Sequence, residues 1–440
     1  MSVFPPTSLP KHPKDLWILS LAELCERFAL VGIGSLLVLF LIEYYHFSNS
    51  KAALLYGVFS GVATFLPLFG GWVADRWNYR SPILIGAILN AIGCFILATG
   101  TPASLYISLI VMSTGYGLFT PSLVTLLGHA YRDLPALREK GFTIYYAVIN
   151  GGVTLALISI GSIAKWMSWQ AAFVLAGLVQ VLGLIPLIWY FLRHKETYRS
   201  LNAFQRKGFL EERSLSPFEK RRLVVIFTFF LVSIFFWVTY NQGYSSMAIF
   251  VHSYMNQRVL GFEVPEGVFL ASVTFFLILL VPVTAFLYSW LQMRNKDPSP
   301  AKKISLSLFA LAAAFLVMVF ATYNIPAAAT SANVSSGYIV SSYFLIAVGE
   351  MLLAPIGLSV VSRLSPPRYT ALMVGIWYVC VGFAFFSGGM LASLMEKVGG
   401  LSHFFAFFVI LNAILGLLMW LLSRKLTDLS TNEEGRSPHV

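Results

Sequence analysis

Long apolar stretches alternate with short polar segments along nearly the whole chain. A helix of about 20 apolar residues is long enough to cross a bilayer, and twelve stretches reach that length. They lie near residues 16–42, 52–74, 81–99, 103–130, 142–164, 171–193, 223–251, 266–291, 303–323, 337–362, 370–396 and 402–423. The pattern predicts an all-α membrane protein with twelve transmembrane helices.

Composition supports this prediction. Of the 440 residues, 58% are hydrophobic and only 11% are charged, and the mean hydropathy is +0.76. These values exclude a soluble domain of this length. The first 15 residues are polar and lack the short apolar core of a signal peptide, so we expect the first span to direct insertion.

Lysine and arginine residues orient the predicted spans. Of the 30 such residues, 25 fall in the terminal segments and the even-numbered connections, 4 fall on the opposite side, and Arg27 lies within a span. Because cytoplasmic loops carry the excess of positive charge, we expect both termini in the cytoplasm. The same distribution accounts for the net charge of +11, so we expect no nucleic-acid partner.

The longest polar segment divides the spans into two sets of six. It covers residues 193–222 and carries nine basic residues among four glutamates. Two six-helix halves around a central cytoplasmic loop are the layout of major facilitator transporters. The loop is either a solvated segment lying on anionic lipid or a docking site for a partner. We expect a cytoplasmic N-terminus (1–15), a first bundle (16–193), a linker (194–222), a second bundle (223–423) and a cytoplasmic tail (424–440).

Three formal charges lie inside the first predicted span: Glu23, Glu26 and Arg27. Their spacing of i, i+3 and i+4 puts them on one helix face and makes Glu23 and Arg27 a favourable pair. A charge near the bilayer centre costs at least about 2.5–3.5 kcal/mol, so it indicates a function by default. We expect one carboxylate to neutralise the guanidinium and the other to exchange a proton. The alternative is an ion-pair network that only locks helices together.

A further acid, Glu350, lies deep in the tenth predicted span. Pro355 and Gly357 follow it, and we expect them to interrupt the helix and free backbone carbonyls, which favours a cavity wall over a lipid-facing surface. The alternative is a buried, protonated carboxyl group without a role in transport.

Polar residues in two other spans are candidates for lining a solute pocket. In the seventh span, residues 240–246 include Asn241 and Tyr244 and contain no purely apolar side chain. In the fifth span, Asn150 precedes two glycines. Such residues either face a water-filled cavity or bond neighbouring helices, and both interpretations stay open.

The connection between the second and third spans resembles the major facilitator loop signature G-x-x-x-D-R-x-x-x-R. Its positions are held by Gly71, Asp75, Arg76 and Arg80. Gly71 would allow a close helix approach, and Asp75 lies at a helix end, where it can pair with a base or a helix N-terminus. We expect a gating latch on the cytoplasmic side, with an ordinary basic loop as the alternative.

Other kinds of chemistry have no pattern in the sequence. No Gly-rich phosphate loop occurs, so we do not expect ATP to drive the protein. Cys25, Cys94 and Cys380 all fall in apolar segments and show neither a disulfide framework nor a metal-ligand spacing. We also see no His/Cys cluster and no nucleophile–base pair. We therefore expect no cofactor, no metal and no enzymatic activity.

Several stretches together resemble the proton-dependent oligopeptide transporter family. The first span carries E-x-x-E-R-F from Glu23, and residues 141–152 carry G-F-T-I-Y-Y followed by I-N-G-G. The seventh span is entered through L-S-P-F-E-K at 215–220. The most extended similarity, over 343–377, includes G-E-M-L-L-A-P-I-G-L-S and G-I-W. The resemblance covers both halves and implies a major facilitator fold.

The resemblance also implies roles for individual residues. It implies that Glu23, Glu26 and Arg27 take part in proton coupling. Glu350 matches an acid implicated in gating and in binding the peptide amino group. Two further positions match residues that line the pocket, Asn150 and Trp377; for the tryptophan, the alternative is a packing aromatic.

The sequence departs from the family at several pocket positions. Where the family has tyrosines, an arginine, its acid partner and a lysine, this chain has Leu30, Val31, Thr64, Gly34, Asn241 and Thr120. Loss of the arginine together with its acid leaves no orphan buried charge. Loss of the lysine leaves Glu350 without a cation, so we expect it to be protonated or to await a cationic group of the solute. The missing cations weaken the case for a solute with a free C-terminal carboxylate.

We therefore expect a proton-coupled secondary transporter that moves a small polar solute, with di- and tripeptides as the leading candidates. The pocket should lie near mid-membrane between the halves. One alternative is the same fold moving an amine-bearing metabolite, inward or outward; another is a non-transporting sensor or scaffold. The expected partners are the solute, protons and membrane lipids, and we expect a monomer in a bacterial inner membrane.

Overall fold

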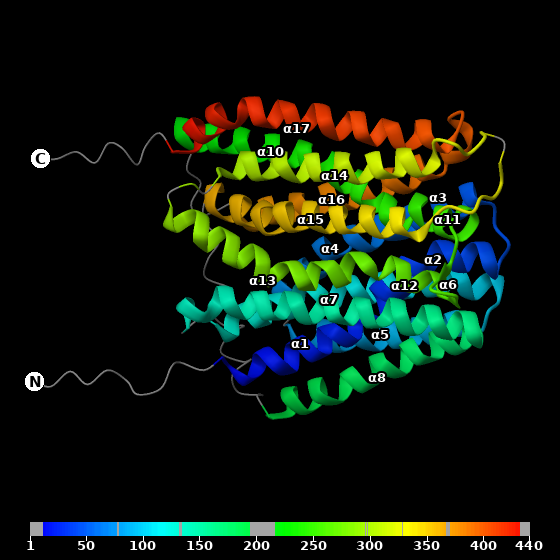
Figure 1. Cartoon of the computed structure of the whole chain (residues 1–440). Coiled ribbons are helices and arrows are strands. Elements are labelled where there is room, and N and C mark those ends of the chain that lie inside the picture. The colour runs from blue at the N-terminus through cyan, green and yellow to red at the C-terminus, as the bar shows by residue number, and fades with distance from the viewer. Residues whose placement is uncertain are drawn as a thin grey trace, which may run out of the picture.

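The computed structural model describes residues 12–76, 79–131, 134–193, 216–294, 296, 298–327, 329–366 and 370–431. Twelve helical segments within these residues are long and apolar enough to cross a membrane, which confirms the predicted spans. Helix α1 begins, and helix α17 ends, at the same end of the molecule (Figure 1). We call this the terminal end and the opposite one the distal end.

The six spans before residue 194 form what we call the N-half. Its elements are α1 (Lys14–Glu26), η1 (Arg27–Val31), α2 (Gly32–Glu43), α3 (Asn49–Phe65), α4 (Pro67–Arg76), α5 (Arg80–Ala98), α6 (Pro102–Ala130), α7 (Pro135–Trp166) and α8 (Trp169–Arg193). The first span combines α1, η1 and α2, and the second combines α3 and α4.

The six spans after residue 215 form the C-half. Its elements are α10 (Pro217–Asn241), η2 (Gln242–Tyr244), α11 (Ser246–Tyr254), β1 (Arg258–Val259), β2 (Phe262–Glu263), α12 (Glu266–Leu270), α13 (Ser272–Met293), α14 (Pro300–Thr322), α15 (Ser336–Leu364), α16 (Thr370–Ala392), η4 (Met395–Lys397) and α17 (Leu401–Thr431). Most of the predicted linker, residues 194–215, lies outside the described residues.

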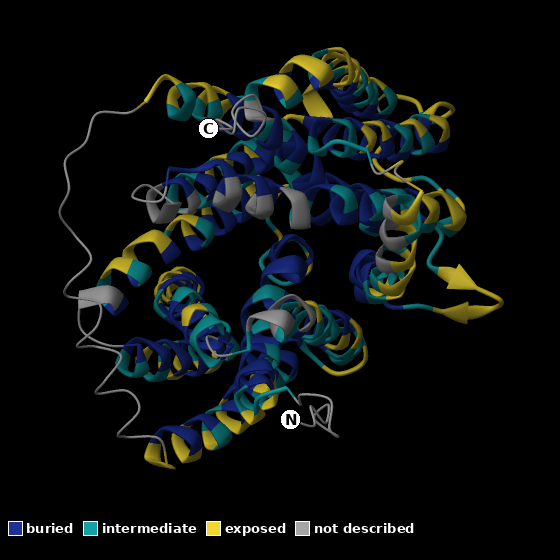
Figure 2. Ribbon diagram, turned by 90° about the vertical axis from the view of Figure 1, so that its left-hand side faces the viewer, coloured by how far each residue is buried: buried dark blue, intermediate teal, exposed yellow. Residues whose placement is uncertain are grey.

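Large apolar side chains cover the outward faces of the helices. Ile110 is 68% exposed, Leu182 is 62% exposed and Phe286 is 72% exposed. Exposed residues lie mainly on the outer faces of the helices and on the β1–β2 hairpin, whereas buried residues gather between the helices (Figure 2). Since soluble proteins do not expose apolar surface on this scale, these faces are suited to lipid.

The seventh span begins earlier than its hydropathy predicts. The side chain of Ser216 accepts a hydrogen bond from the Glu219 backbone amide, and the Glu219 carboxylate accepts one from the Ser216 amide. This reciprocal capping satisfies free amides at the helix start. The helix therefore begins at Pro217, before the predicted residue 223.

The expected interruption of the tenth span is wrong. Helix α15 continues from Ser336 to Leu364 and passes through Pro355 and Gly357. A proline is tolerated in a transmembrane helix where neighbouring groups compensate for the lost hydrogen bond. The role of Gly357 is instead steric, because a Cβ atom there would overlap the Trp377 ring on α16.

The glycine that permits a close approach in the second span is Gly70 rather than Gly71. A Cβ atom on Gly70 would overlap the backbone of Gly117 on α6, whereas one on Gly71 would make only an ordinary contact with Pro121, at 3.8 Å. The loop signature thus fixes the motif but not which of two adjacent glycines faces the neighbouring helix.

Glycine-mediated contacts join the two halves toward the distal end. Gly57 on α3 faces Gly389 on α16, and a Cβ atom on Gly57 would lie 2.7 Å from the Gly389 Cα. Gly161 on α7 faces Gly267 on α12, where a Cβ atom on Gly161 would lie 2.9 Å from the Gly267 Cα. Small residues allow backbones to approach closely where lipid provides no hydrophobic drive. The structure therefore has its distal end closed.

Substitution of Gly389 by alanine should loosen the distal contact, because the added methyl group meets the α3 backbone. Overpacking of this kind costs about 1–3 kcal/mol. Spin labels at the exposed residues Met167 and Val398 should report a longer distance across the distal end. Gly151→Ala is the control, since no atom lies within 4 Å of its added Cβ. Unchanged distances in Gly389→Ala would contradict the closure by glycine packing.

Candidate functional site

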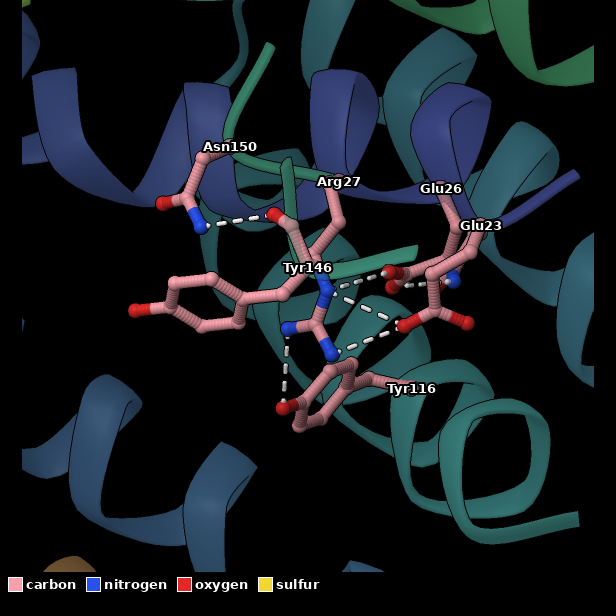
Figure 3. A network of polar contacts seen from close by, with 7 residues as sticks. Glu23, Glu26, Arg27, Tyr116, Tyr146 and Asn150 are labelled. Carbon is pink, nitrogen blue, oxygen red and sulfur yellow. Dashed lines mark hydrogen bonds and ion pairs between the residues drawn. The ribbon is translucent and has the colours of Figure 1, made fainter. Parts of the chain in front are cut away.

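The first span contains a buried network around Arg27. Its Nη2 lies 2.8 Å from Glu23 Oε1, and its Nε lies 3.0 Å from the same oxygen and 3.7 Å from Glu26 Oε2. Both carboxylates are fully buried, and the arginine side chain is 16% exposed. Figure 3 shows the carboxylates of Glu23 and Glu26 directed at the Arg27 guanidinium. The predicted pairing of Glu23 with Arg27 is thus present.

The helix changes its winding at this network. Residues Arg27–Val31 form a π-helical turn between α1 and α2, where α-helical spacing was expected. Such turns inside helices occur frequently at functional sites because they redirect side chains. Here the wider turn begins at Arg27, directly after the second carboxylate.

Residues from two other spans complete the network. Tyr116 on α6 accepts a hydrogen bond from Arg27 Nη1 at 3.1 Å, and Asn90 on α5 donates one to Glu26 Oε1 at 3.2 Å. The second oxygen atoms, Glu23 Oε2 and Glu26 Oε2, are buried without a hydrogen-bond partner among the described residues. Two carboxylates facing one guanidinium therefore leave unused acceptor capacity, which is where a proton can be held.

Glu350 lies at the contact between the halves. The Tyr146 hydroxyl on α7 donates a hydrogen bond to Glu350 Oε1 at 3.2 Å, while Glu350 Oε2 is buried without a described partner. Tyr240 and Tyr244, on α10 and η2, lie beside the same carboxyl group. Glu350 is thus surrounded by phenol groups rather than by the cation that the family usually supplies.

The remaining predicted pocket residues form specific contacts. Asn150 Nδ2 donates to the Tyr146 carbonyl at 2.9 Å, and Asn241 Nδ2 donates across the halves to the Tyr56 hydroxyl at 3.2 Å. Trp377 is buried and packs on Gly357 and Phe230. This is the behaviour of a packing aromatic, the alternative interpretation of this residue. Their contact with a solute stays a prediction.

The polar run of the seventh span is buried in this conformation. Gln242 donates to the carbonyls of Val238 and Gly388 at 3.1 and 2.9 Å, and Ser245 donates to the Asn241 carbonyl at 2.9 Å. The helix also changes from α10 to a 3-10 turn at Gln242. Of these contacts, the one from Gln242 to Gly388 on α16 joins two helices, which favours bonding between helices over an open water-filled lining.

The predicted latch is described only in part. Asp75 and Arg76 lie at the end of α4, but their side chains are outside the described part of the chain. The Arg80 guanidinium lies over the Phe191 ring on α8, 5.8 Å from its centroid. The gating role of the loop stays a prediction.

Comparison with known proteins assigns the fold to a family. A family model described as the Major Facilitator Superfamily matches residues 19–336. The chain belongs to this superfamily. Over 471 aligned residues it is 24% identical to the uncharacterized transporter YclF of Bacillus subtilis, covering 94% of each chain. It is 25% identical to the peptide transporter YePEPT of Yersinia enterocolitica, covering 86% of this chain and 87% of that one.

A solved structure agrees with this assignment. A POT family transporter in complex with 5-aminolevulinic acid superimposes with a TM-score of 0.83 and 21% identity, covering 96% of this chain and 99% of that one. The predicted resemblance to the proton-dependent oligopeptide transporter family is confirmed. The matched proteins are transporters, so this superfamily member is an integral membrane transporter and not an enzyme.

Sequence reasoning missed the partners that lie far away in the chain. Nothing around Asn90, Tyr116 or Tyr56 distinguishes these residues from other polar groups in spans. Tyr146 belongs to the similarity over 141–152, but its contact with Glu350 links the halves of the transporter. Periodicity reports which residues share a face of one helix, not which helix that face meets.

Removal of Arg27 alone should destabilise the transporter strongly. Arg27→Met leaves two buried carboxylates without a cation, and breaking a buried pair in this way costs about 3–5 kcal/mol. The double variant Glu23→Gln/Arg27→Met should recover part of the loss. The measurement is the apparent melting temperature in detergent, with Arg424→Met on the exposed face of α17 as the control. A double variant that is less stable than Arg27→Met would contradict the claim that Arg27 stabilises the protein by neutralising Glu23.

Proposed function

We propose that this transporter couples the movement of a small polar solute to protons by alternating access, with both termini in the cytoplasm of a bacterial cell. Di- and tripeptides are the leading solutes. The observation that carries the proposal is the network of two fully buried carboxylates and one guanidinium in the first span. With both acids ionised it holds an excess negative charge, which binding of one proton removes.

In this proposal, protons and solute are bound by different groups. The Glu23–Glu26–Arg27 network bonds to residues of the N-half, Tyr116 and Asn90, whereas Glu350 bonds across the halves to Tyr146. A carboxyl group at the junction, with a free oxygen, is suited to a cationic group of a solute. A solute cation bound at Glu350 Oε2 would leave the Tyr146 bond to Oε1 in place, so the carboxyl group could contact the solute and the N-half at the same time.

Substitutions of Glu26 and Glu350 should affect dipeptide transport in proteoliposomes differently. Glu26→Gln removes a proton acceptor but leaves the pocket intact, so gradient-driven accumulation of a labelled dipeptide should fall at least about fivefold. Solute exchange without a gradient should persist. Glu350→Gln should lower both gradient-driven accumulation and exchange, because it removes the group that would face the solute. Asp428→Asn, exposed on α17, is the matched control.

The same assay separates the rival functions. Accumulation that survives in Glu26→Gln would contradict proton coupling through this network. Transport by the native protein would exclude the sensor or scaffold. An absence of transport with every peptide, together with binding of an amine ligand, would replace peptides by an amine-bearing metabolite. That rival has support of its own, since one matched transporter was solved with 5-aminolevulinic acid.

Modified dipeptides should reveal which terminus the pocket recognises. N-acetylation removes the charge that Glu350 would bind, and truncating a buried charge pair costs about 2–5 kcal/mol, or at least about 30-fold in Kd. Amidation of the C-terminus should change the affinity by less than about threefold, because the usual cations are replaced by Gly34 and Thr120. Ligand-induced thermal stabilisation measures both. Loss of binding on amidation but not on acetylation would reverse the assignment.

A further inference from the structure

Three potential metal ligands converge at the distal end, away from the site described above. Glu43 ends α2 in the N-half, His252 lies on α11, and Glu266 begins α12 in the C-half. His252 Nδ1 lies 3.1 Å from Glu266 Oε1 and 3.6 Å from Glu43 Oε1. One ligand atom from each of the three residues lies within 4.8 Å of the other two.

The two distances from His252 Nδ1 are compatible with a small divalent ion. Zinc binds imidazole nitrogen and carboxylate oxygen at about 2.0–2.2 Å in a tetrahedral arrangement, which separates ligand atoms by about 3.3 Å. The two distances from His252 Nδ1 lie on either side of that value. An imidazole with two carboxylates is also a ligand set that favours zinc over magnesium, which prefers oxygen ligands alone.

Neighbouring residues hold both carboxylates in place. Trp169 Nε1 donates to Glu43 Oε2 at 3.0 Å, and Gln257 Nε2 donates to Glu266 Oε1 at 2.7 Å. Hydrogen bonds of this kind orient metal ligands and are worth tenfold or more in affinity. Each carboxylate is therefore positioned before an ion arrives.

An unused acceptor and an adjacent space complete the arrangement. Glu266 Oε2 is buried without a hydrogen-bond partner among the described residues, and the Glu266 side chain is only 11% exposed. A cavity of about 310 Å³ borders Glu43 and Glu266 and is lined also by Lys165 and Trp169. It has room for a water molecule as the fourth ligand.

The charges around the cluster allow a cation to bind. The two carboxylates carry a charge of −2, and His252 Nδ1, which hydrogen-bonds to Glu266 Oε1, must give up any proton it carries there before an ion can take its place. The nearby ammonium of Lys165 lies 2.9 Å from Glu263 Oε1 on the hairpin and donates to Gln257 Oε1 at 3.0 Å. Since this lysine has its own counter-ion, it does not substitute for a cation between Glu43 and Glu266.

We propose that Glu43, His252 and Glu266 form a binding site for a divalent transition-metal ion of the zinc type, which ties the N-half to the C-half at the distal end. Sequence spacing did not reveal the site because its members lie in three different elements. Binding does not depend on the proposed function, whereas any effect on transport rests on it. A bound ion would hold the distal end closed and slow a cycle that must open it.

The binding test is a titration of the untagged, detergent-purified protein with Zn²⁺ alone, followed by calorimetry and thermal shift. Binding of one ion and a rise in melting temperature are expected, with no response to Mg²⁺. His252→Gln and Glu266→Gln should abolish the response. Trp169→Phe, which keeps all three ligands, should weaken it by about 10–100-fold. His403→Gln, exposed at the distal end of α17, should leave it unchanged.

The bridging test uses spin labels at Met167 and Val398, one on each half. Zn²⁺ should narrow the distribution of distances across the distal end in the native background and have no effect in His252→Gln. Zinc binding that persists in His252→Gln and Glu266→Gln would overturn the site, and binding without any change in the label distances would overturn the bridge. Both readouts are independent of solute transport, so they remain decisive if the protein moves no peptide.

Discussion

Burial of Arg27 between two carboxylates is the interaction on which the first half depends. A lone guanidinium or a lone carboxylate could not stay in the membrane interior at an acceptable energy, so Glu23 and Arg27 require each other. Glu26 is the surplus charge, and Asn90 gives it one neutral hydrogen bond. The network is therefore stable with one proton added, and its charge balance changes when the proton leaves. That property makes a structural ion pair usable for coupling.

Contacts between the halves change in character along the membrane normal. Toward the middle, the Tyr146 hydroxyl on α7 donates a hydrogen bond to the Glu350 carboxyl group on α15. At the distal end they are glycine contacts and charged groups, including Lys165 with Glu263. A single hydrogen bond is easily exchanged, whereas close backbone contacts resist separation and an exposed ion pair adds little to them. This gradient suits a protein whose pocket must bind weakly while its gate closes tightly.

The features that could be predicted from the sequence are those that depend on the spacing of residues within one helix. The twelve spans follow from apolar length, and the Glu23–Arg27 pair follows from i,i+4 geometry, so both are present in the structure. Features that depend on the facing helix were not predictable. Gly70 rather than Gly71 meets α6, and α15 continues through Pro355 to Leu364. The π-helical turn at Arg27 likewise has no signal in the apolar pattern.

Departures from the family pattern become coherent when the packing is considered. At the position of the usual arginine, a Cβ atom on Gly34 would lie 3.1 Å from the Phe59 ring, so this aromatic group occupies the approach to the missing side chain. At the position of its usual acid partner, Asn241 Nδ2 donates a hydrogen bond to the Tyr56 hydroxyl. The charged pair has thus been replaced by a ring and a neutral hydrogen bond, which leaves no orphan charge. In the proposed pocket, the end near Gly34 and Asn241 would be neutral, while Glu350 would keep the other end acidic. Under the proposed function, selection of the solute would then depend on its cationic group.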